Sequence, residues 1–336
     1  MSRALPWAQH RLGAGELARF GEGDGITVGV VDTGVSATAE ALRGRVAGAP
    51  AALRDCVGHG TFMAGIVAAA PRSGVQFSGL APASRILAAR GTDASGVAGA
   101  DLVAQGIRTT VDGGADVVVV SAALARTTRE LTSAVRYAQQ HDVLIVAPAV
   151  PDSQYGQPGL TDAAAAPEQF WPAAQQGVLA VVDVDIDGNR PDGGLVPLRA
   201  DLAAPGQGVT GIGPLGEGHY LANGASVAAA FVAGAAALVR AHEPGLTAAQ
   251  VAERLKRRSY PADVPRLDVV AALTELPPSE RPGRTFQDPS VRLRPVAGHN
   301  PAQGRAVALA GLCLVGTLVL GAVRWLTVRS RRAEGA

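Results

Sequence analysis

The fold is decided by the stretch VGVVDTGVS, Val28–Ser36, an apolar strand that ends in an acid and a turn. The apolar run covers residues 26–35 and is nearly continuous, which is typical of a strand buried on both faces. Asp32 and Gly34 close this run. The stretch therefore predicts a buried strand whose carboxyl end carries a carboxylate.

Further apolar strands alternate with helices along the rest of the chain. The sequence predicts strands at 84–90, 115–124, 143–150 and 178–188, and helices at 61–70, 100–114, 129–142 and 226–244. Such alternation indicates an α/β fold, a three-layer sandwich in which helices cover both faces of a mostly parallel sheet. Functional sites of these folds collect at the carboxyl ends of the strands, where Asp32 stands.

Composition excludes several classes of protein. The 336 residues are 47% apolar, which is enough for a large core, and the net charge of +1 gives no indication of a nucleic-acid partner. The two cysteines do not make a disulfide framework, because Cys313 lies within a C-terminal apolar run, and Cys56 is predicted to be a free thiol. DVDIDGN, residues 183–189, lacks the ligand spacing of a calcium loop and predicts a solvated turn, so neither a metal nor a cofactor is expected.

Changes in composition divide the chain into four segments. Residues 1–275 are predicted to form the globular domain, and residues 276–305 a linker rich in proline and arginine. Residues 306–328 predict a single transmembrane helix, because an uncharged run long enough to span a bilayer is followed by tryptophan and arginines. Residues 329–336 are a basic tail, predicted to be cytoplasmic, which places the globular domain outside the cell membrane.

Two alternatives to this topology stay open at the level of sequence. The C-terminal apolar run also suits a buried helix, although the linker before it and the arginines after it favour the membrane. The first twenty residues contain no basic start followed by an apolar core, so they do not supply the export signal that an outside domain requires. Either the domain is cytoplasmic or a signal precedes Met1.

Asp-Thr-Gly after an apolar strand is found in two kinds of protease active site. An aspartic protease needs two such loops, whose carboxylates share a proton, and the sequence contains no second loop of this kind. A serine protease needs a histidine and a serine as well. DCVGHGTFMAGIVAAA, residues 55–70, places His59 between two glycines at a helix start, and NGASVAAAFVAGAAALV, residues 223–239, places Ser226 at another.

Asp32, His59 and Ser226 follow one of the known orders of an Asp–His–Ser triad. In a triad the histidine removes the proton of the serine nucleophile, and the buried aspartate fixes the tautomer of the imidazole. Gly58 and Gly60 are expected to leave room for the backbone of a substrate. Each triad residue alone has an ordinary structural explanation, as a strand-end acid, a helix-starting histidine or a helix cap. Together and in this order they predict a catalytic site.

Several stretches resemble the subtilisin-like serine proteases, and most closely the mycosins, the membrane-anchored proteases of actinobacterial type VII secretion. The resemblance spans roughly residues 6–328 and is carried by the stretches 6–35, 55–68, 79–90, 112–121 and DLAAPG at 201–206. It implies a subtilisin-like fold and an endopeptidase that needs no cofactor. It also implies that the substrate is a protein of a type VII secretion system and that a membrane complex of that system is a partner.

The chain departs from the family pattern around the expected site. Alanines stand at positions 225 and 230, where the family has threonine and proline. Pro151 stands where the oxyanion-hole asparagine is expected, Val150 replaces a glycine, and Ala123 replaces the glycine of the edge that pairs with substrate. Since proline offers neither a side-chain amide nor a backbone N–H, the sequence predicts reduced activity.

These departures leave a second function open, that of a pseudoprotease that serves as a structural component of a secretion complex. A cytoplasmic subtilase or a different hydrolase is the remaining alternative. The order of the family segments and the presence of all three triad residues favour an active serine endopeptidase.

Overall fold

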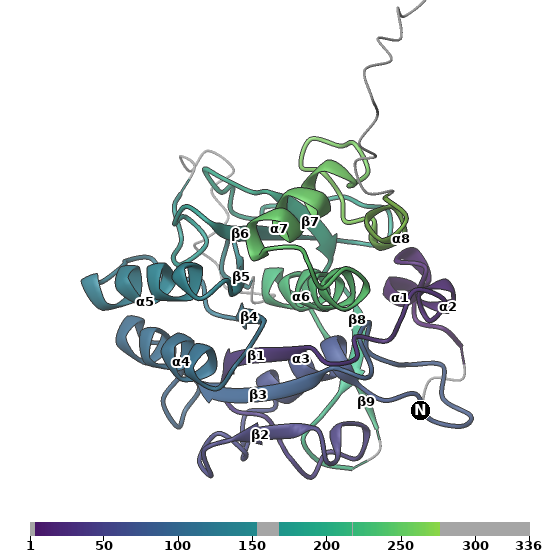
Figure 1. Ribbon diagram of the computed structural model, residues 1–336, viewed down its shortest axis with the longest axis horizontal. Coiled ribbons are helices and arrows are strands. Elements are labelled where there is room, and N and C mark those ends of the chain that lie inside the picture. Colours follow the sequence, from purple (N-terminus) through teal and green to yellow (C-terminus); the bar gives the residue numbers. More distant parts are fainter. Residues whose placement is uncertain (1–3, 153–167, 217, 276–336) are drawn as a thin grey trace, which may run out of the picture. The chain divides into compact units, whose positions relative to one another are not determined.

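The computed structural model describes residues 4–152, 168–216 and 218–275, which all belong to the first of two compact units, Met1–Pro277 (Figure 1). The predicted linker, transmembrane helix and basic tail lie outside the described residues. The helices are α1 (Trp7–Arg11), α2 (Ala14–Leu17), η1 (Glu40–Leu42), α3 (His59–Ala68), α4 (Ala100–Asp112), α5 (Arg129–Gln140), α6 (Ala225–His242), α7 (Ala248–Arg257) and α8 (Val269–Leu273). The strands are β1 (Thr27–Asp32), β2 (Val46–Gly48), β3 (Arg85–Arg90), β4 (Val117–Val120), β5 (Leu144–Pro148), β6 (Val178–Val184), β7 (Leu202–Pro205), β8 (Val209–Ile212) and β9 (His219–Ala222).

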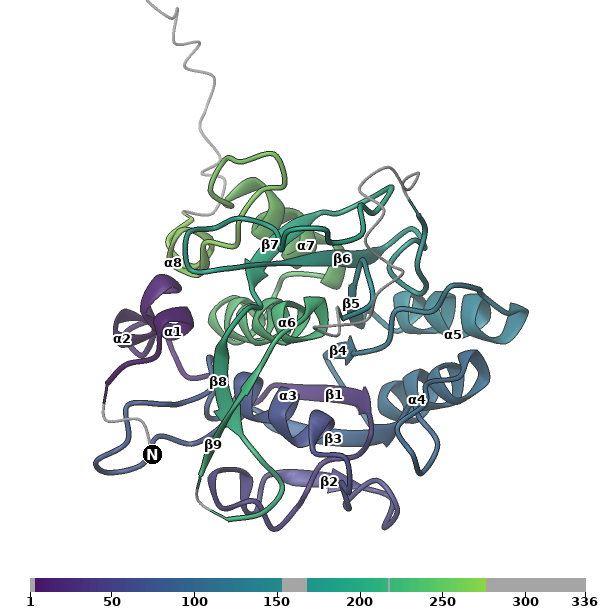
Figure 2. The same cartoon turned by 180° about the vertical axis from the view of Figure 1, so that it is seen from behind.

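Seven strands form one sheet in the order β2-β3-β1-β4-β5-β6-β7, and every neighbouring pair is parallel. β1 lies inside the sheet, with Val28 opposite Ile86 of β3 on one side and Val117 of β4 on the other. The mostly parallel sheet predicted from the apolar strands is therefore confirmed. β8 and β9 form a separate antiparallel hairpin that lies beside α3 (Figure 2).

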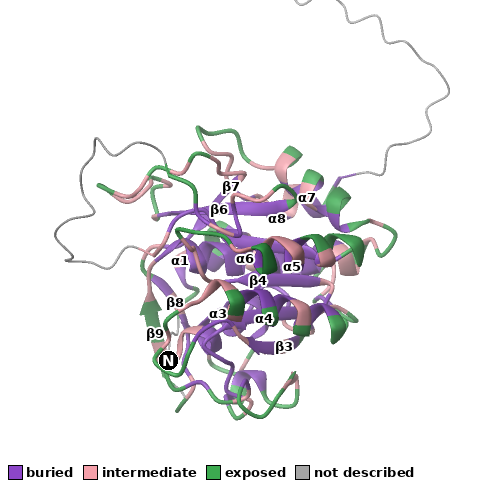
Figure 3. Ribbon diagram, turned by 90° about the vertical axis from the view of Figure 1, so that its left-hand side faces the viewer, coloured by how far each residue is buried: buried purple, intermediate pink, exposed green. Residues whose placement is uncertain are grey.

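Helices cover both faces of the sheet, so the predicted three-layer sandwich is also confirmed (Figures 1 and 3). α4 and α5 pack on one face, and α3 and α6 on the other. The side chains of the four valines of β4 point alternately to the two faces of the sheet. Val117 and Val119 belong to the core that contains α3 and α6, whereas Val118 and Val120 belong to the core beneath α4 and α5. A strand buried on both faces needs apolar residues at every position, which explains the continuous run.

The long apolar helix α6 lies at the centre of the larger core. Its residues 225–239 are all buried, and most of them are alanine or glycine. Such small side chains let neighbouring elements pack closely: a Cβ at Gly234 would lie 3.1 Å from the Cβ of Leu80. Within the described part of the chain α6 is the one helix long and apolar enough to cross a membrane, but its burial identifies it as a core helix.

Three strands end before their predicted limits. The strand predicted at 115–124 ends at Val120, and the strand predicted at 143–150 ends at Pro148. The strand predicted at 178–188 ends at Val184, because Asp185 begins a turn. Its Oδ1 accepts hydrogen bonds from the backbone N–H groups of Asp187, at 3.0 Å, and Asn189, at 2.8 Å. This side chain–backbone pattern competes with strand pairing and explains the early end. The solvated turn expected for DVDIDGN is present over 185–189.

Candidate active site

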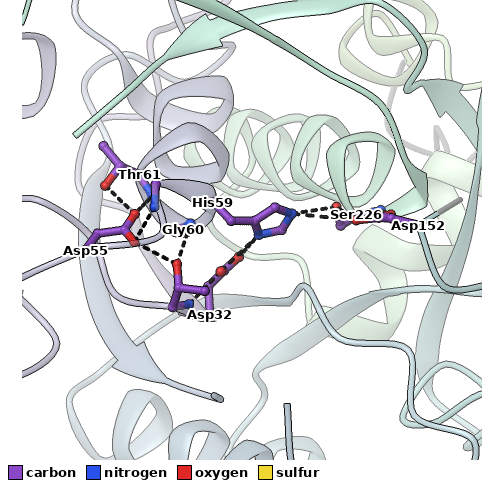
Figure 4. Close-up of polar contacts among 9 residues, drawn as sticks. Asp32, Asp55, His59, Gly60, Thr61, Asp152 and Ser226 are labelled. Carbon is purple, nitrogen blue, oxygen red and sulfur yellow. Dashed lines mark hydrogen bonds and ion pairs between the residues drawn. The ribbon is translucent and has the colours of Figure 1, made fainter. Parts of the chain in front are cut away.

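Asp32 lies at the carboxyl end of β1 and is almost completely buried, at 2% exposure. Its Oδ1 and Oδ2 lie 3.0 and 2.8 Å from Nδ1 of His59, and the backbone N–H of Thr33 donates to Oδ1 at 2.5 Å (Figure 4). Burial raises the pKa of the Asp32 carboxyl, but the charge and hydrogen bond of His59 outweigh burial and lower the pKa below 3.8. Asp32 is therefore a carboxylate that holds one nitrogen of the histidine ring.

His59 begins α3, where glycines allow the helix to approach the turn after β1. Gly58 has φ 95°, a left-handed conformation that favours glycine. A Cβ at Gly60 would lie 2.0 Å from the carbonyl oxygen of Gly34 and 3.0 Å from the Cβ of Asp32. The expectation that Gly60 makes room for a substrate backbone is wrong, because this glycine makes room for the protein's own turn.

Asp55 ties the turn after β1 to the start of α3, and the sequence did not single it out. One oxygen accepts from the hydroxyl of Thr33 at 2.8 Å and the N–H of Gly58 at 2.7 Å. The other accepts from the N–H and hydroxyl of Thr61 at 2.8 and 2.7 Å, and the N–H of Gly60 donates back to the hydroxyl of Thr33 (Figure 4). This buried network fixes His59 relative to Asp32. Its only sequence signal is an acid four residues before the histidine.

Ser226 lies in the first turn of α6, after Gly224. Its Oγ lies 3.1 Å from Nε2 of His59, on the opposite side of the ring from Asp32 (Figure 4). Ser226 is completely buried, whereas 32% of the His59 side chain is exposed. The three residues predicted from the sequence are thus brought together in hydrogen-bonding order, with the ring open to solvent.

Asp152 is the unexpected member of the site. Its Oδ1 accepts the backbone N–H of Ser226 at 2.9 Å, and its Oδ2 accepts the hydroxyl of Ser226 at 2.6 Å (Figure 4). A Cβ at Gly224 would lie 2.1 Å from Oδ1 of Asp152, so this approach requires glycine. The sequence predicts Pro151 at the place of the oxyanion-hole asparagine. In the structure the side chain that reaches Ser226 belongs to the next residue, Asp152.

His59 lies between two carboxylates. Burial lowers the pKa of the His59 imidazole, but the charge of Asp32, followed by the interaction with Asp152, outweighs burial and raises the pKa well above 6.5. The distance from Nε2 of His59 to Oδ2 of Asp152 is 3.6 Å. The two carboxylates, one near each nitrogen of the ring, therefore favour the imidazolium form of His59.

Three of the departures from the family pattern, at positions 123, 150 and 225, pack together beside this site. Val150 forms a small apolar cluster with Phe170 and Ala225, and Ala123 and Leu195 pack against it. The larger side chain at position 150 thus meets small side chains at positions 123 and 225. Among the described residues, no group of three or more His, Cys, Asp or Glu side chains is placed to hold a metal ion, and Cys56 is an exposed free thiol.

Sequence comparisons match this chain to one protein family. Residues 23–284 match the model of the subtilase family of peptidases. An alkaline protease of Shouchella clausii is 31% identical over 260 residues, which cover 76% of this chain and 65% of the protease. Mycosin-4 of Mycobacterium tuberculosis is 33% identical over 285 residues, which cover 73% of this chain and 62% of the mycosin. The chain thus spans somewhat less than two thirds of the length of these relatives.

Solved structures give the same family. The structure of MycP1 from Mycobacterium smegmatis has a TM-score of 0.70 and 28% identity, and the match covers 85% of this chain and 90% of MycP1. A chain in an intact ESX-5 inner membrane complex has the same TM-score and identity over 96% of this chain and 90% of that one. Together with the match over residues 23–284 and the parallel sheet, these similarities show that the chain belongs to the subtilase family of serine peptidases and resembles the mycosins.

Proposed function

We propose that this chain is a mycosin-like serine endopeptidase that hydrolyses peptide bonds with Asp32, His59 and Ser226. The observation that carries the proposal is the aligned geometry around one ring. Nδ1 of His59 lies 2.8 Å from Asp32, and Nε2 lies 3.1 Å from the hydroxyl of Ser226. Both distances fall within the reach that proton transfer in such a triad requires.

The chemistry follows from the two sides of the imidazole. Neutral His59 takes the hydroxyl proton of Ser226 as Oγ attacks the carbonyl carbon of the scissile bond. Asp32 stabilises the imidazolium that results, and the imidazolium then gives its proton to the leaving amine. Water enters by the same route and releases the acyl group from Ser226. The backbone N–H of Ser226 points to where the negative oxygen forms, provided that Asp152 releases it.

The secretion system is the setting that the similarities support best. Relatives named mycosins and a structural neighbour within an ESX-5 inner membrane complex support a membrane-associated peptidase of a type VII secretion complex. In this proposal residues 1–275 are the peptidase domain on the outer side of the cell membrane, 276–305 the linker, 306–328 the single transmembrane helix and 329–336 the cytoplasmic tail. The substrate is a protein exported by that complex or a component of it.

Cleavage of a peptide mixture tests the proposed activity whatever the sequence specificity of the enzyme. The purified chain is incubated with a proteome-derived peptide library, and new termini are identified by mass spectrometry. We expect new termini with the wild type and none with Ser226→Ala, because the variant keeps the fold and lacks the nucleophile. Identical termini with both proteins would contradict the proposal. The subtilase match and the aligned triad favour this activity over a structural pseudoprotease.

A further inference from the structure

Asp152 accepts hydrogen bonds from both groups of Ser226 that the reaction uses, the backbone N–H and the hydroxyl. The N–H of Ser226 is the donor that a developing oxyanion needs, and Oδ1 of Asp152 holds it at 2.9 Å. During the reaction the hydroxyl of Ser226 must pass its proton to His59. In the structure this hydroxyl instead donates a hydrogen bond to Oδ2 of Asp152, with 2.6 Å between the two oxygens. An ionised carboxylate at this place competes with the substrate oxygen for one donor and repels the charge that forms on it.

Two titratable groups from neighbouring elements interact with the charge of Asp152. His59, from α3, lies 3.6 Å from Oδ2, and Asp32 holds the far nitrogen of that ring. Asp183, from β6, is buried, and burial raises the pKa of its carboxyl above 3.8. The hydrogen bond from Gln207 and the charge of Arg190 lower this pKa, and the charge of Asp152 makes a smaller contribution that raises it. Oδ2 of Asp152 thus lies 3.6 Å from Nε2 of His59 and 2.6 Å from the hydroxyl of Ser226, so these three groups form a short path along which a proton can pass.

We propose that Asp152 is a fourth catalytic residue. When its carboxyl carries the proton that His59 otherwise holds, it supplies the oxyanion donor that the site lacks. Because it describes how the same site turns over, this inference rests on the proposed peptidase function. In the resting state His59 is an imidazolium and Asp152 a carboxylate. In the productive state Asp152 is a carboxylic acid and His59 is neutral.

The exchange between these states balances without any outside reagent. Nε2–H of His59 passes its proton to Oγ of Ser226 as the hydroxyl proton of Ser226 passes to Oδ2 of Asp152, along contacts of 3.1 and 2.6 Å. Afterwards Nε2 carries a lone pair that can accept the serine proton during attack. The new O–H of Asp152 and the N–H of Ser226 can both donate to the substrate oxygen.

This arrangement predicts the shape of the pH profile. Both states contain one shared proton, so the rate is highest where the pair holds a single proton and falls when a second proton is added or the first is lost. The wild type should therefore show a bell-shaped profile for the rate of phosphonylation by a fluorophosphonate probe. A wild-type rate that rises with pH to a plateau, with no descending limb, would overturn the inference without any variant.

Asp152→Asn replaces the shared acid by a permanent amide donor. The expected rate increase is on the order of 10²-fold or more, the magnitude attached to one oxyanion donor in a subtilisin. The descending limb of the pH profile should disappear, because His59 is then the one titrating group left of the pair. With one carboxylate fewer beside the ring, the pKa of His59 should fall, so the ascending limb moves to lower pH. Asp152→Ala should also lose the descending limb, but its rate should not exceed that of the wild type, because alanine offers no donor to the substrate oxygen.

Two controls separate failure of this inference from failure of the proposed function. Asp187→Asn removes a carboxylate from the exposed turn after β6 and should leave both rate and profile unchanged. Ser226-dependent labelling of the wild type, with no faster labelling or an unchanged bell in Asp152→Asn, would overturn the inference and leave the peptidase intact. No Ser226-dependent labelling in either the wild type or Asp152→Asn would overturn both.

Discussion

At the scale of residues, Asp55 is the support on which the triad geometry depends. It accepts four hydrogen bonds, two of them from backbone N–H groups at the start of α3. Asp55→Ala would leave buried donors without a partner, and each such donor costs about 1–3 kcal/mol. We therefore predict that the free energy of unfolding falls by about 2–4 kcal/mol and that probe labelling of Ser226 falls with it.

Urea unfolding and labelling, measured on the same preparation, check this prediction. Asp24→Ala, in an exposed turn before β1, is the matched control and should change neither quantity. If Asp55→Ala unfolds at the wild-type urea concentration, the network does not hold the start of α3 as described.

The raised pKa of His59 predicts a pH dependence of stability. The folded state binds a proton at this ring more tightly than the unfolded state, so the stabilisation is fully present below pH 6.5 and is lost as pH rises through the higher folded-state pKa. The wild type should thus lose stability as pH rises above 6.5. The His59→Gln variant should lose much less stability over the same range of pH above 6.5. Equal slopes for the two proteins in urea unfolding at a series of pH values would contradict the paired imidazolium.

The residues that could be predicted from sequence are those whose neighbours in the chain report their role. Asp32, His59 and Ser226 each stand at the end of a strand or the start of a helix, in segments with a recognisable pattern. The role of Asp152 could not be predicted, because its position in the sequence after β5 does not show whether its side chain or that of Pro151 turns toward Ser226. Asp55 carries only the weak signal of an acid four residues before the histidine, because two of its four hydrogen bonds come from backbone N–H groups, which leave no pattern in the sequence.

At the scale of elements, the start of α3 must contact the turn after β1 for the site to form. Gly60→Ala would place a Cβ 2.0 Å from the carbonyl oxygen of Gly34, a backbone atom that a change of rotamer cannot move. We predict a loss of about 3 kcal/mol or more in the free energy of unfolding, since helix and turn must separate.

Gly15→Ala is the matched control for this substitution. Gly15 lies in α2, and a Cβ there would meet nothing within 4 Å. The free energy of unfolding of this variant should be unchanged or higher by up to about 1 kcal/mol, because alanine stabilises a helix more than glycine does. Thermal unfolding of the two variants beside the wild type provides the measurement. A Gly60→Ala protein as stable as Gly15→Ala would contradict the close contact between α3 and β1.

The buried elements could be predicted from sequence, whereas the short and exposed ones could not. β1, β3, β4, β5 and β6 are apolar on both faces, so their runs stand out in the sequence itself. β2 has three residues, and β9 is largely exposed, so neither carries a hydrophobic pattern that distinguishes a strand from a loop. β7 is recognisable as the segment DLAAPG but not as a strand, since its four residues end at a proline.

At the scale of the whole molecule, the layered architecture follows from the alternation of strands and helices and was predictable. The anchor stays a prediction, because it falls outside the described residues. Deleting residues 304–336 should move the protein from the membrane fraction to the soluble fraction, since the deletion removes the uncharged run of membrane-spanning length. Deleting residues 329–336 alone keeps that run and should leave the protein in the membrane. Fractionation with a carbonate wash measures both, and unchanged partitioning of the longer deletion would refute the anchor.

The central claim is that His59, held by Asp32, activates the hydroxyl of Ser226, and the site of reaction with a fluorophosphonate tests it most directly. Mass spectrometry of the labelled and digested protein identifies the modified residue. The account predicts a single adduct on Ser226 in the wild type, and none in His59→Ala, because the ring that removes the serine proton is gone. An adduct of equal yield on Ser226 in His59→Ala, or an adduct on another serine in the wild type, would contradict it.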